Sequence, residues 1–299
     1  MLYSMKDLLD HALKNHYCVI APSIRNENCM RAAIEAAEEL NSPVILNCLP
    51  MSWDMDDWDR DKEAIKFQVD IARRYALGTK VPVAINRDHS KDFEGCAQAI
   101  HAGMTSVMLD CSSMSFEENV ANTKEVVRMA HACGVSVEAE LGHVGTQDAG
   151  LLSPSSGVKL GSPMEPESVL TRPEEIKEFV AKTGVDCVAV SIGNQHGLYS
   201  GTPHIDFELL QKLHEAVPDT PLVMHGGSGT GDENIAKAAK MGICKINVGA
   251  DVEKGAWKAV VDTYKEKGIV RNPFQVEREG YKAEVKRQMK LLGSVGQAW

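Results

Sequence analysis

The most regular feature of the chain is an alternation of short apolar runs with longer segments of helical periodicity. Eight runs have the length and the β-branched content of buried strands. They lie at residues 17–21, 43–47, 81–86, 105–110, 135–141, 187–193, 221–225 and 244–248. Eight strands with intervening helices in 299 residues predict one (β/α)8 TIM barrel domain over residues 1–299, with its active groups at the carboxyl ends of the strands. A doubly wound open sheet is the alternative, although such sheets usually have fewer strands.

Signals for the ends of helices fit the same alternation. Ser4 is expected to cap an amphipathic first helix, and two capping boxes are expected, one from Ser115 with Glu118 and one from Thr171 with Glu174. Glycines end helices shortly before the next strand, at Gly134, Gly184 and Gly242. A C-terminal helix is expected at about 277–292. The segment 143–168 is rich in Pro, Gly and Ser and is predicted to be a lid or insertion over the barrel mouth, with an inert surface insertion as the alternative.

Composition and charge narrow the choice of partners. Acidic residues outnumber basic ones 42 to 32, for a net charge of -10, and Lys and Arg do not cluster, which argues against nucleic acid and anionic membranes. No apolar run has transmembrane length and the N-terminal segment resembles a helix more than a signal peptide, so we expect a cytoplasmic protein. The eight cysteines form no CxxC pair, which favours reduced thiols over disulfides or a zinc knuckle.

Polar side chains at the ends of the predicted strands form a candidate site. His89, His196 and His225 each lie just beyond an apolar run, so parallel strands would bring them to one rim of the barrel. Carboxylate and amide side chains share these strand ends, namely Asn47, Asp88, Asp110, Glu140 and Asn247. One histidine after a strand is more often structural, but three beside carboxylates predict a metal site. Three neutral imidazoles suit Zn²⁺, although cobalt, iron or manganese could take the same ligands.

Two glycine-rich turns follow the seventh and eighth predicted strands, in the strings "HGGSGTGDENIAKAAK" and "NVGADVEKGAWKAV". Each turn leads into a helix whose free backbone N–H groups can bind an anion, and TIM barrels often bind phosphate at these loops. Ordinary turn glycine is the alternative for either loop alone. Both turns together, beside His225, predict an anion site that includes Gly226, Gly227, Ser228 and Gly249.

These strings resemble the class II, zinc-dependent ketose-bisphosphate aldolases, which include fructose- and tagatose-bisphosphate aldolases. The resemblance runs from the first helix to "KAEVKRQMK", and its most specific strings are "DH", "VEAELG", "SIGNQHGLYS", "VMHGGSG" and "KINV". It implies reversible aldol cleavage of a ketose or ketose phosphate through a metal-stabilised enediolate of a dihydroxyacetone (phosphate)-like donor. It also implies a homodimer or homotetramer and, in some members, a bound monovalent cation.

The resemblance assigns roles to individual residues. His89, His196 and His225 match the zinc ligands, with Glu140 near the metal, and Asp88 matches the acid that donates a proton to, or hydrogen-bonds, the aldehyde oxygen. The positions that bind the ketose phosphate or orient the enediolate are matched by Gly197, Gly226, Ser228 and Asn247.

Several positions depart from the family pattern. Asp148 stands where the family has a glutamate base, and we predict that it removes the α-proton. Ser200 and Gly201 replace a lysine, and Ala250 replaces a threonine, on the phosphate side. Arg25, on the loop after the first strand, is a candidate for the lost anion contact, with pairing to an acidic neighbour as the alternative.

The loop after the second predicted strand and the reaction each have alternative interpretations. The loop after the second strand carries Trp53 and Trp58, which are predicted to form a substrate wall or a subunit contact. Two other functions use the same residues. One is a metal-dependent sugar epimerase or isomerase, and the other is a non-catalytic sugar-binding relative, which the retained histidines and Asp88 argue against.

Overall fold

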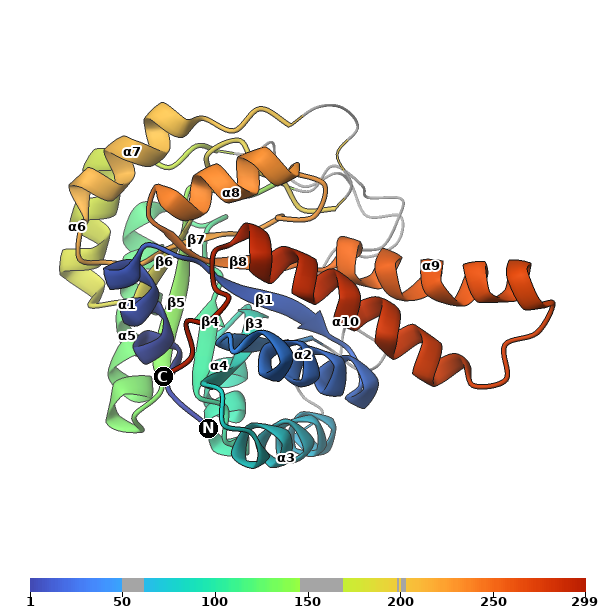
Figure 1. Ribbon diagram of the computed structural model, residues 1–299. Coiled ribbons are helices and arrows are strands. Elements are labelled where there is room, and N and C mark those ends of the chain that lie inside the picture. The colour runs from blue at the N-terminus through green and yellow to red at the C-terminus, as the bar shows by residue number, and fades with distance from the viewer. Residues whose placement is uncertain (50–61, 146–168, 198, 200–202) are drawn as a thin grey trace, which may run out of the picture.

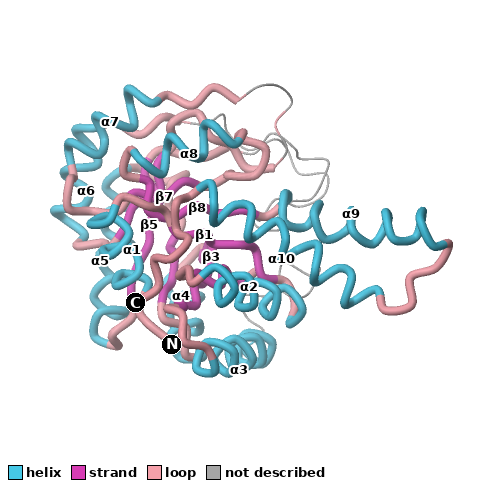
Figure 2. Tube along the Cα trace, viewed as in Figure 1, coloured by secondary structure: helices cyan, strands magenta, loops and turns pink. Residues whose placement is uncertain are grey.

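The computed structural model describes residues 1–49, 62–145, 169–197, 199 and 203–299. Eight parallel strands form a closed barrel in which each strand pairs with the next and the last pairs with the first (Figures 1 and 2). The strands are β1 (Val19–Ile24), β2 (Val44–Cys48), β3 (Val83–Ser90), β4 (Ser106–Leu109), β5 (Ser136–Leu141), β6 (Cys187–Val190), β7 (Leu222–Met224) and β8 (Ile243–Val248). Every predicted strand is present, so the predicted (β/α)8 barrel is confirmed.

Helices cover the outside of the barrel and close one of its ends. They are α1 (Met5–Asn15), α2 (Glu27–Leu40), α3 (Lys62–Gly78), α4 (Phe93–Ala102), α5 (Phe116–Ala132), α6 (Pro173–Thr183), α7 (Phe207–Ala216), α8 (Asp232–Lys240), α9 (Ala250–Lys267) and α10 (Pro273–Leu291). No helix among the described residues is both long enough and apolar enough to cross a bilayer.

The core has two layers because alternate strand residues face opposite sides. Outward-facing residues pack beneath the surrounding helices in one large apolar cluster. The inner cluster is smaller and includes Ala21, Ala84 and Ala189, and it also contains Leu8 and Leu9 of α1. The apolar face of α1 therefore closes the amino-terminal end of the barrel. The mouth at the carboxyl ends of the strands is the end where TIM barrels carry their active groups.

The helix ends agree with the sequence-based predictions except at the start of α6. Ser4 caps α1, Ser115 and Glu118 form the predicted capping box of α5, and Gly184 ends α6 in the left-handed conformation. The capping box expected from Thr171 and Glu174 is wrong. The Thr171 hydroxyl instead donates to the carbonyl of Leu141 and accepts from the N–H of Ser191, so it bridges the ends of β5 and β6. Helix α6 consequently begins at Pro173 without a side-chain cap.

The C-terminal part of the chain forms a two-helix arm. Helix α10, predicted at about 277–292, spans Pro273–Leu291 and packs on α2 and α9, and the far ends of α9 and α10 project away from the barrel (Figure 1). The bounds of the predicted 143–168 lid are only partly described. His143 and Val169 pair as an antiparallel bridge, whereas residues 146–168 lie outside the described residues. The same holds for Trp53, Trp58 and Asp148.

Candidate metal centre

The three predicted histidines meet at the carboxyl end of the barrel. His225 Nδ1 lies 3.0 Å from His89 Nε2 and 3.4 Å from His196 Nε2. Each residue offers one nitrogen to a group whose members all lie within 4.8 Å of one another. Two imidazole nitrogens bound tetrahedrally to one Zn²⁺ at 2.0–2.1 Å lie about 3.3 Å apart. The spacing therefore fits one metal ion.

The local backbone explains how neighbouring residues reach the same site. Asp88 and His89 are consecutive, and a regular strand would point them to opposite faces. The pairing of β3 with β4 shifts register between Arg87 and Ser90, and His89 has a φ of 45°. This bulge turns both side chains toward the mouth, as bulges beside active sites commonly do.

A close backbone approach positions the other two histidines. Gly226, directly after His225, has a φ of 64°, and a Cβ there would lie 1.9 Å from the carbonyl oxygen of Gln195. Only glycine fits this approach, which brings the segment after β6 against the segment after β7. The N–H of His196 also donates to the carbonyl of Gly145, 2.9 Å away. Backbone contacts therefore set the distance between His196 and His225.

Each imidazole is oriented by an acceptor on its other nitrogen. His89 Nδ1 donates to Asp110 Oδ2 at 2.9 Å. His196 Nδ1 donates to the carbonyl of Val144 at 3.2 Å, and His225 Nε2 donates to Glu138 Oε1 at 2.7 Å. Such outer partners fix the tautomer of metal-binding histidines. The remaining three nitrogens lie close together, within reach of one cation.

Glu140 adds a buried carboxyl group beside these nitrogens. Its Oε1 accepts from the N–H of Val144, while Oε2 lies 3.9 Å from His225 Nδ1 and has no hydrogen-bond partner among the described residues. Burial, followed by repulsion from Asp110, raises the pKa of Glu140 to about 8. A buried carboxylate oxygen without a donor is costly unless a cation satisfies it. The residues present therefore fit a metal ion.

The histidines differ in their protonation. Burial, together with repulsion from His89, lowers the pKa of His196 to about 3, and burial also lowers the pKa of His225. Burial acts in the same direction on His89, but Asp88 and the hydrogen bond to Asp110 outweigh it and raise its pKa to about 10. His196 and His225 are thus neutral, as ligands must be, and a cation bound at His89 would displace a proton.

Asp88 is held ionised next to the histidines. Burial disfavours its charge, but His89, His225 and other neighbours lower its pKa to about 2. Its Oδ2 accepts from Asn47 Nδ2 at 2.7 Å, and Asn247 Nδ2 lies 3.2 Å from its Oδ1. Oδ1 is also 4.0 Å from His89 Nε2. An oriented carboxylate therefore lies within reach of a substrate that binds the same metal.

The predicted anion-binding residues lie together beside this centre. The Ser228 hydroxyl accepts from the N–H groups of Gly249 and Asp251, both at 3.1 Å, so the loops after β7 and β8 are joined. Gly227 donates to the carbonyl of Asn247 at 3.0 Å. The backbone of Gly197, beside His196, has a φ of 88°.

Arg25, the candidate for a lost anion contact, is engaged by another residue. It forms an ion pair with Glu253 in the first turn of α9. The alternative of pairing with an acidic neighbour is thus the arrangement in the structure, and a contact between Arg25 and an anion stays a prediction.

Sequence reasoning missed residues one layer below the strand ends and on one flank. Glu138 and Lys245 are fully buried and ion-paired at 2.7 Å inside the barrel. Their signal was a charged residue within an apolar strand, in "VEAEL" and "CKINV".

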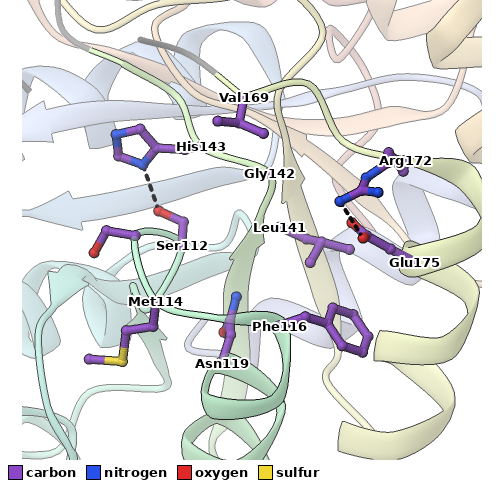
Figure 3. Close-up of a pocket in the computed structure, with 11 residues that line it drawn as sticks. Ser112, Met114, Phe116, Asn119, Leu141, Gly142, His143, Val169, Arg172 and Glu175 are labelled. Atoms are coloured by element: carbon purple, nitrogen blue, oxygen red, sulfur yellow. Dashed lines mark hydrogen bonds and ion pairs between the residues drawn. The ribbon is translucent and has the colours of Figure 1, made fainter. Parts of the chain in front are cut away.

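On the flank of the site, Ser112 Oγ donates to Asp110 Oδ1 at 2.7 Å and lies 2.9 Å from His143 Nδ1 (Figure 3). This extends the support of His89 toward a cavity of about 280 Å³ lined by Ser112 and His143.

The chain is similar to known proteins over almost its whole length. The family model described as fructose-bisphosphate aldolase class-II matches residues 3–297. The fructose-bisphosphate aldolase of Geobacillus stearothermophilus and the probable fructose-bisphosphate aldolase of Bacillus subtilis (strain 168) are each 38% identical over 302 residues, covering 99% of both chains.

Among solved structures, the YdjI aldolase from Escherichia coli K12 superposes with a TM-score of 0.83 at 31% identity and covers 100% of both chains. A putative fructose-1,6-biphosphate aldolase from Coccidioides immitis gives a TM-score of 0.80 at 29% identity, covering 98% of this chain and 96% of that chain. Sequence and structure thus lead to the same place: this protein belongs to the class II fructose-bisphosphate aldolase family and is a class II aldolase, which cleaves a carbon–carbon bond.

Proposed function

We propose that the protein is a zinc-dependent aldolase that reversibly cleaves a ketose or ketose phosphate, with a dihydroxyacetone (phosphate)-like compound as the donor. The observation that carries the proposal is the convergence of three imidazole nitrogens beside the Asp88 carboxylate at the mouth of the barrel. None of the observations favours an epimerase or a binding protein over an aldolase.

His89, His196 and His225 would hold the ion, with Glu140 beside it. A divalent ion bound there supplies a Lewis acid that polarises the ketose carbonyl and stabilises the negative charge that develops during cleavage. Zn²⁺ suits three imidazole ligands with positions open for substrate. Binding of a monovalent cation is a further expectation from the family.

The residues of the chain handle the protons. In the cleavage direction Asp88 accepts the proton of the hydroxyl beyond the breaking bond, and in condensation it returns that proton to the aldehyde oxygen. Asn47 and Asn247 hold the carboxylate in place for both directions. Asp148 remains our candidate for the base that removes the α-proton of the donor, on the strength of its position in the sequence.

The loops after β7 and β8 are proposed to bind the donor phosphate. Gly226, Gly227 and Ser228 lie on the loop between β7 and α8, and Ser228 contacts Gly249, the residue before α9, where the helix dipole favours an anion. Gly197 and Asn247 would contact the rest of the donor. Fructose bisphosphate, named for the relatives, is one candidate within this substrate class.

A panel assay tests the proposal. Ketoses and ketose phosphates are supplied to the enzyme, and aldehyde release is measured before chelation, after chelation and after readdition of zinc. We expect cleavage that chelation abolishes and zinc restores. Activity that survives complete removal of metal would refute the proposal, and an epimeric product without aldehyde would replace it with the epimerase alternative.

We further propose that a second copy of the chain covers the arm. Trp257, Val261 and Tyr264 are spaced four and three residues apart on α9, and Trp257 is 64% exposed. A stripe of large apolar side chains on a projecting helix is typical of an interface. Light scattering should show a dimer or tetramer, and W257E should lower the mass. A reducing cytoplasm fits the eight free cysteines.

A further inference from the structure

A chain of buried charges lies beneath the metal centre. Lys245 Nζ contacts Glu138 Oε2 at 2.7 Å, and Glu138 Oε1 accepts from His225 Nε2 at 2.7 Å. All three side chains have no exposed surface. They come from β8, β5 and the end of β7, so the contacts cross the interior of the barrel.

An irregularity in β8 places the lysine inside. Leu222 pairs with Ile243 but Val223 pairs with Lys245, so Cys244 is an extra residue on β8. Such a bulge lets two consecutive side chains face the same way. Cys244 packs in the inner apolar cluster and Lys245 reaches Glu138, while Ile243 and Ile246 remain in the outer core.

Stability alone does not account for this pair. Removing two charges from water costs several kcal/mol per ion, and well-packed apolar residues often stabilise a core as well or better. What the pair provides is a fixed orientation. Lys245 takes one oxygen of Glu138, which leaves the other oxygen for His225. A lysine can only donate, so it also requires an acceptor at that position.

The consequence falls on the tautomer of His225. His89 and His196 present Nε2 to the metal position, whereas His225 presents Nδ1, because its Nε2 carries the proton given to Glu138. The opposite tautomer would point an N–H at the metal and remove one of the three ligands. We propose that Glu138 and Lys245 act together as a tautomer lock: the lysine orients the carboxylate, and the carboxylate fixes the His225 proton on Nε2. These are positioning residues, and the proposal rests on the metal-dependent function proposed above.

Two double variants test the lock, because Gln and Met are similar in size and differ in having an acceptor. In E138Q/K245M the amide is free to offer its oxygen to His225, so zinc affinity should stay within about tenfold of the wild type. In E138M/K245M position 138 offers no acceptor, and zinc affinity should fall roughly 10- to 100-fold, as for other lost outer partners. Neither variant leaves a buried unpaired charge, so both are expected to fold.

The single variant E138Q should bind zinc more weakly than the double variant E138Q/K245M. Lys245 should capture the amide oxygen, which turns the NH2 toward His225 Nε2 and forces the proton onto Nδ1. Zinc affinity should therefore be lower in E138Q than in E138Q/K245M, a rescue that a purely structural role does not produce. D186N is the matched control, since Asp186 Oδ2 also accepts from a histidine Nε2, that of His131, at 2.8 Å. Asp186 directly precedes β6, at the end of the strand opposite the metal centre.

Zinc affinity is measured by competition with a chromophoric chelator, and ¹⁵N spectra of histidine-labelled protein report which nitrogen of His225 is protonated. Equal zinc affinities in the two double variants, or zinc on Nε2 of His225 in the wild type, would overturn the lock. Neither readout uses aldolase activity. If the wild type binds zinc but cleaves no ketose, the proposed function fails and the lock is still tested.

Discussion

Replacing Asp88 by asparagine should separate the two proton transfers of the reaction. In D88N the new amide can keep its oxygen on Asn47, where Oδ2 now accepts at 2.7 Å. Its NH2 group then occupies the position of Oδ1, 4.0 Å from His89 Nε2, and Asn247 Nδ2 keeps its contact with the oxygen at the Oδ2 position, now 3.3 Å away. The shape of the site is preserved, but the group that exchanges a proton with the aldehyde oxygen is lost.

The size of the effect follows from that single change. General acid–base catalysis by one positioned group contributes about 10²- to 10⁴-fold, or roughly 2.7 to 5.4 kcal/mol of transition-state stabilisation. The D88N enzyme should lose cleavage rate within this range. Zinc affinity should change far less, because Asp88 is not one of the three histidines proposed to hold the ion.

The assay compares two reactions of the same enzyme. Aldehyde release reports carbon–carbon cleavage, while exchange of the α-proton of dihydroxyacetone phosphate with deuterated solvent reports only the action of the other base. Exchange should persist in D88N when cleavage is lost. D92N is the control, since Asp92 caps α4 just beyond the same strand and asparagine caps nearly as well. Parallel loss of exchange and cleavage, with zinc still bound, would show that Asp88 is itself the α-proton base.

Three further outcomes can be checked directly. D110N should weaken zinc binding roughly 10- to 100-fold, measured by chelator competition, because Asp110 orients His89 through its Nδ1, and wild-type affinity would contradict this role. Burial lowers the pKa of His11, so its neutral form stabilises the fold above pH 6.5, and that contribution is lost as pH falls through the lower folded pKa. The melting temperature should therefore decline less on acidification in H11F than in the wild type. Equal slopes of melting temperature against pH would refute this. G226A should unfold at a much lower temperature than G134A. Both glycines have a positive φ, but only at Gly226 would an added Cβ lie 1.9 Å from a carbonyl oxygen. The Cβ in G134A meets no atom within 4 Å, so that variant should lose only the about 1–2 kcal/mol of folding free energy that positive φ costs.

The sequence predicted those parts of the molecule that follow from periodicity. All eight strands and the meeting of His89, His196 and His225 could be foreseen, because parallel strands bring their carboxyl ends to one rim. Thr171 was misread because a threonine three residues before a glutamate suits a capping box, whereas here a tertiary contact to β5 and β6 takes its hydroxyl. Local pattern cannot reveal such a competing partner.

The two strand irregularities, where side chains do not simply alternate between the two faces, both lie near the candidate metal centre. One bulge, in β3, turns His89 toward the mouth beside Asp88, and the other, in β8, accompanies Lys245 beneath His225. Local rules of strand geometry are most often broken where function needs a particular side-chain direction. Both irregularities here serve the same three nitrogens. This is why the candidate metal ligands could be named from strand ends, while Glu138 and Lys245, beneath His225, required the structure.

The relation between metal centre and substrate follows from the same geometry. Most of the candidate ligands and their outer partners stand on strands or directly after them, where pairing with neighbouring strands fixes their positions. His196 lies further beyond β6 and is held by the bond from its N–H to Gly145. The proposed substrate contacts lie mainly on loops, which vary more freely than the elements they connect. The barrel strands therefore position most of the candidate metal site, and the substrate has to be identified by assay.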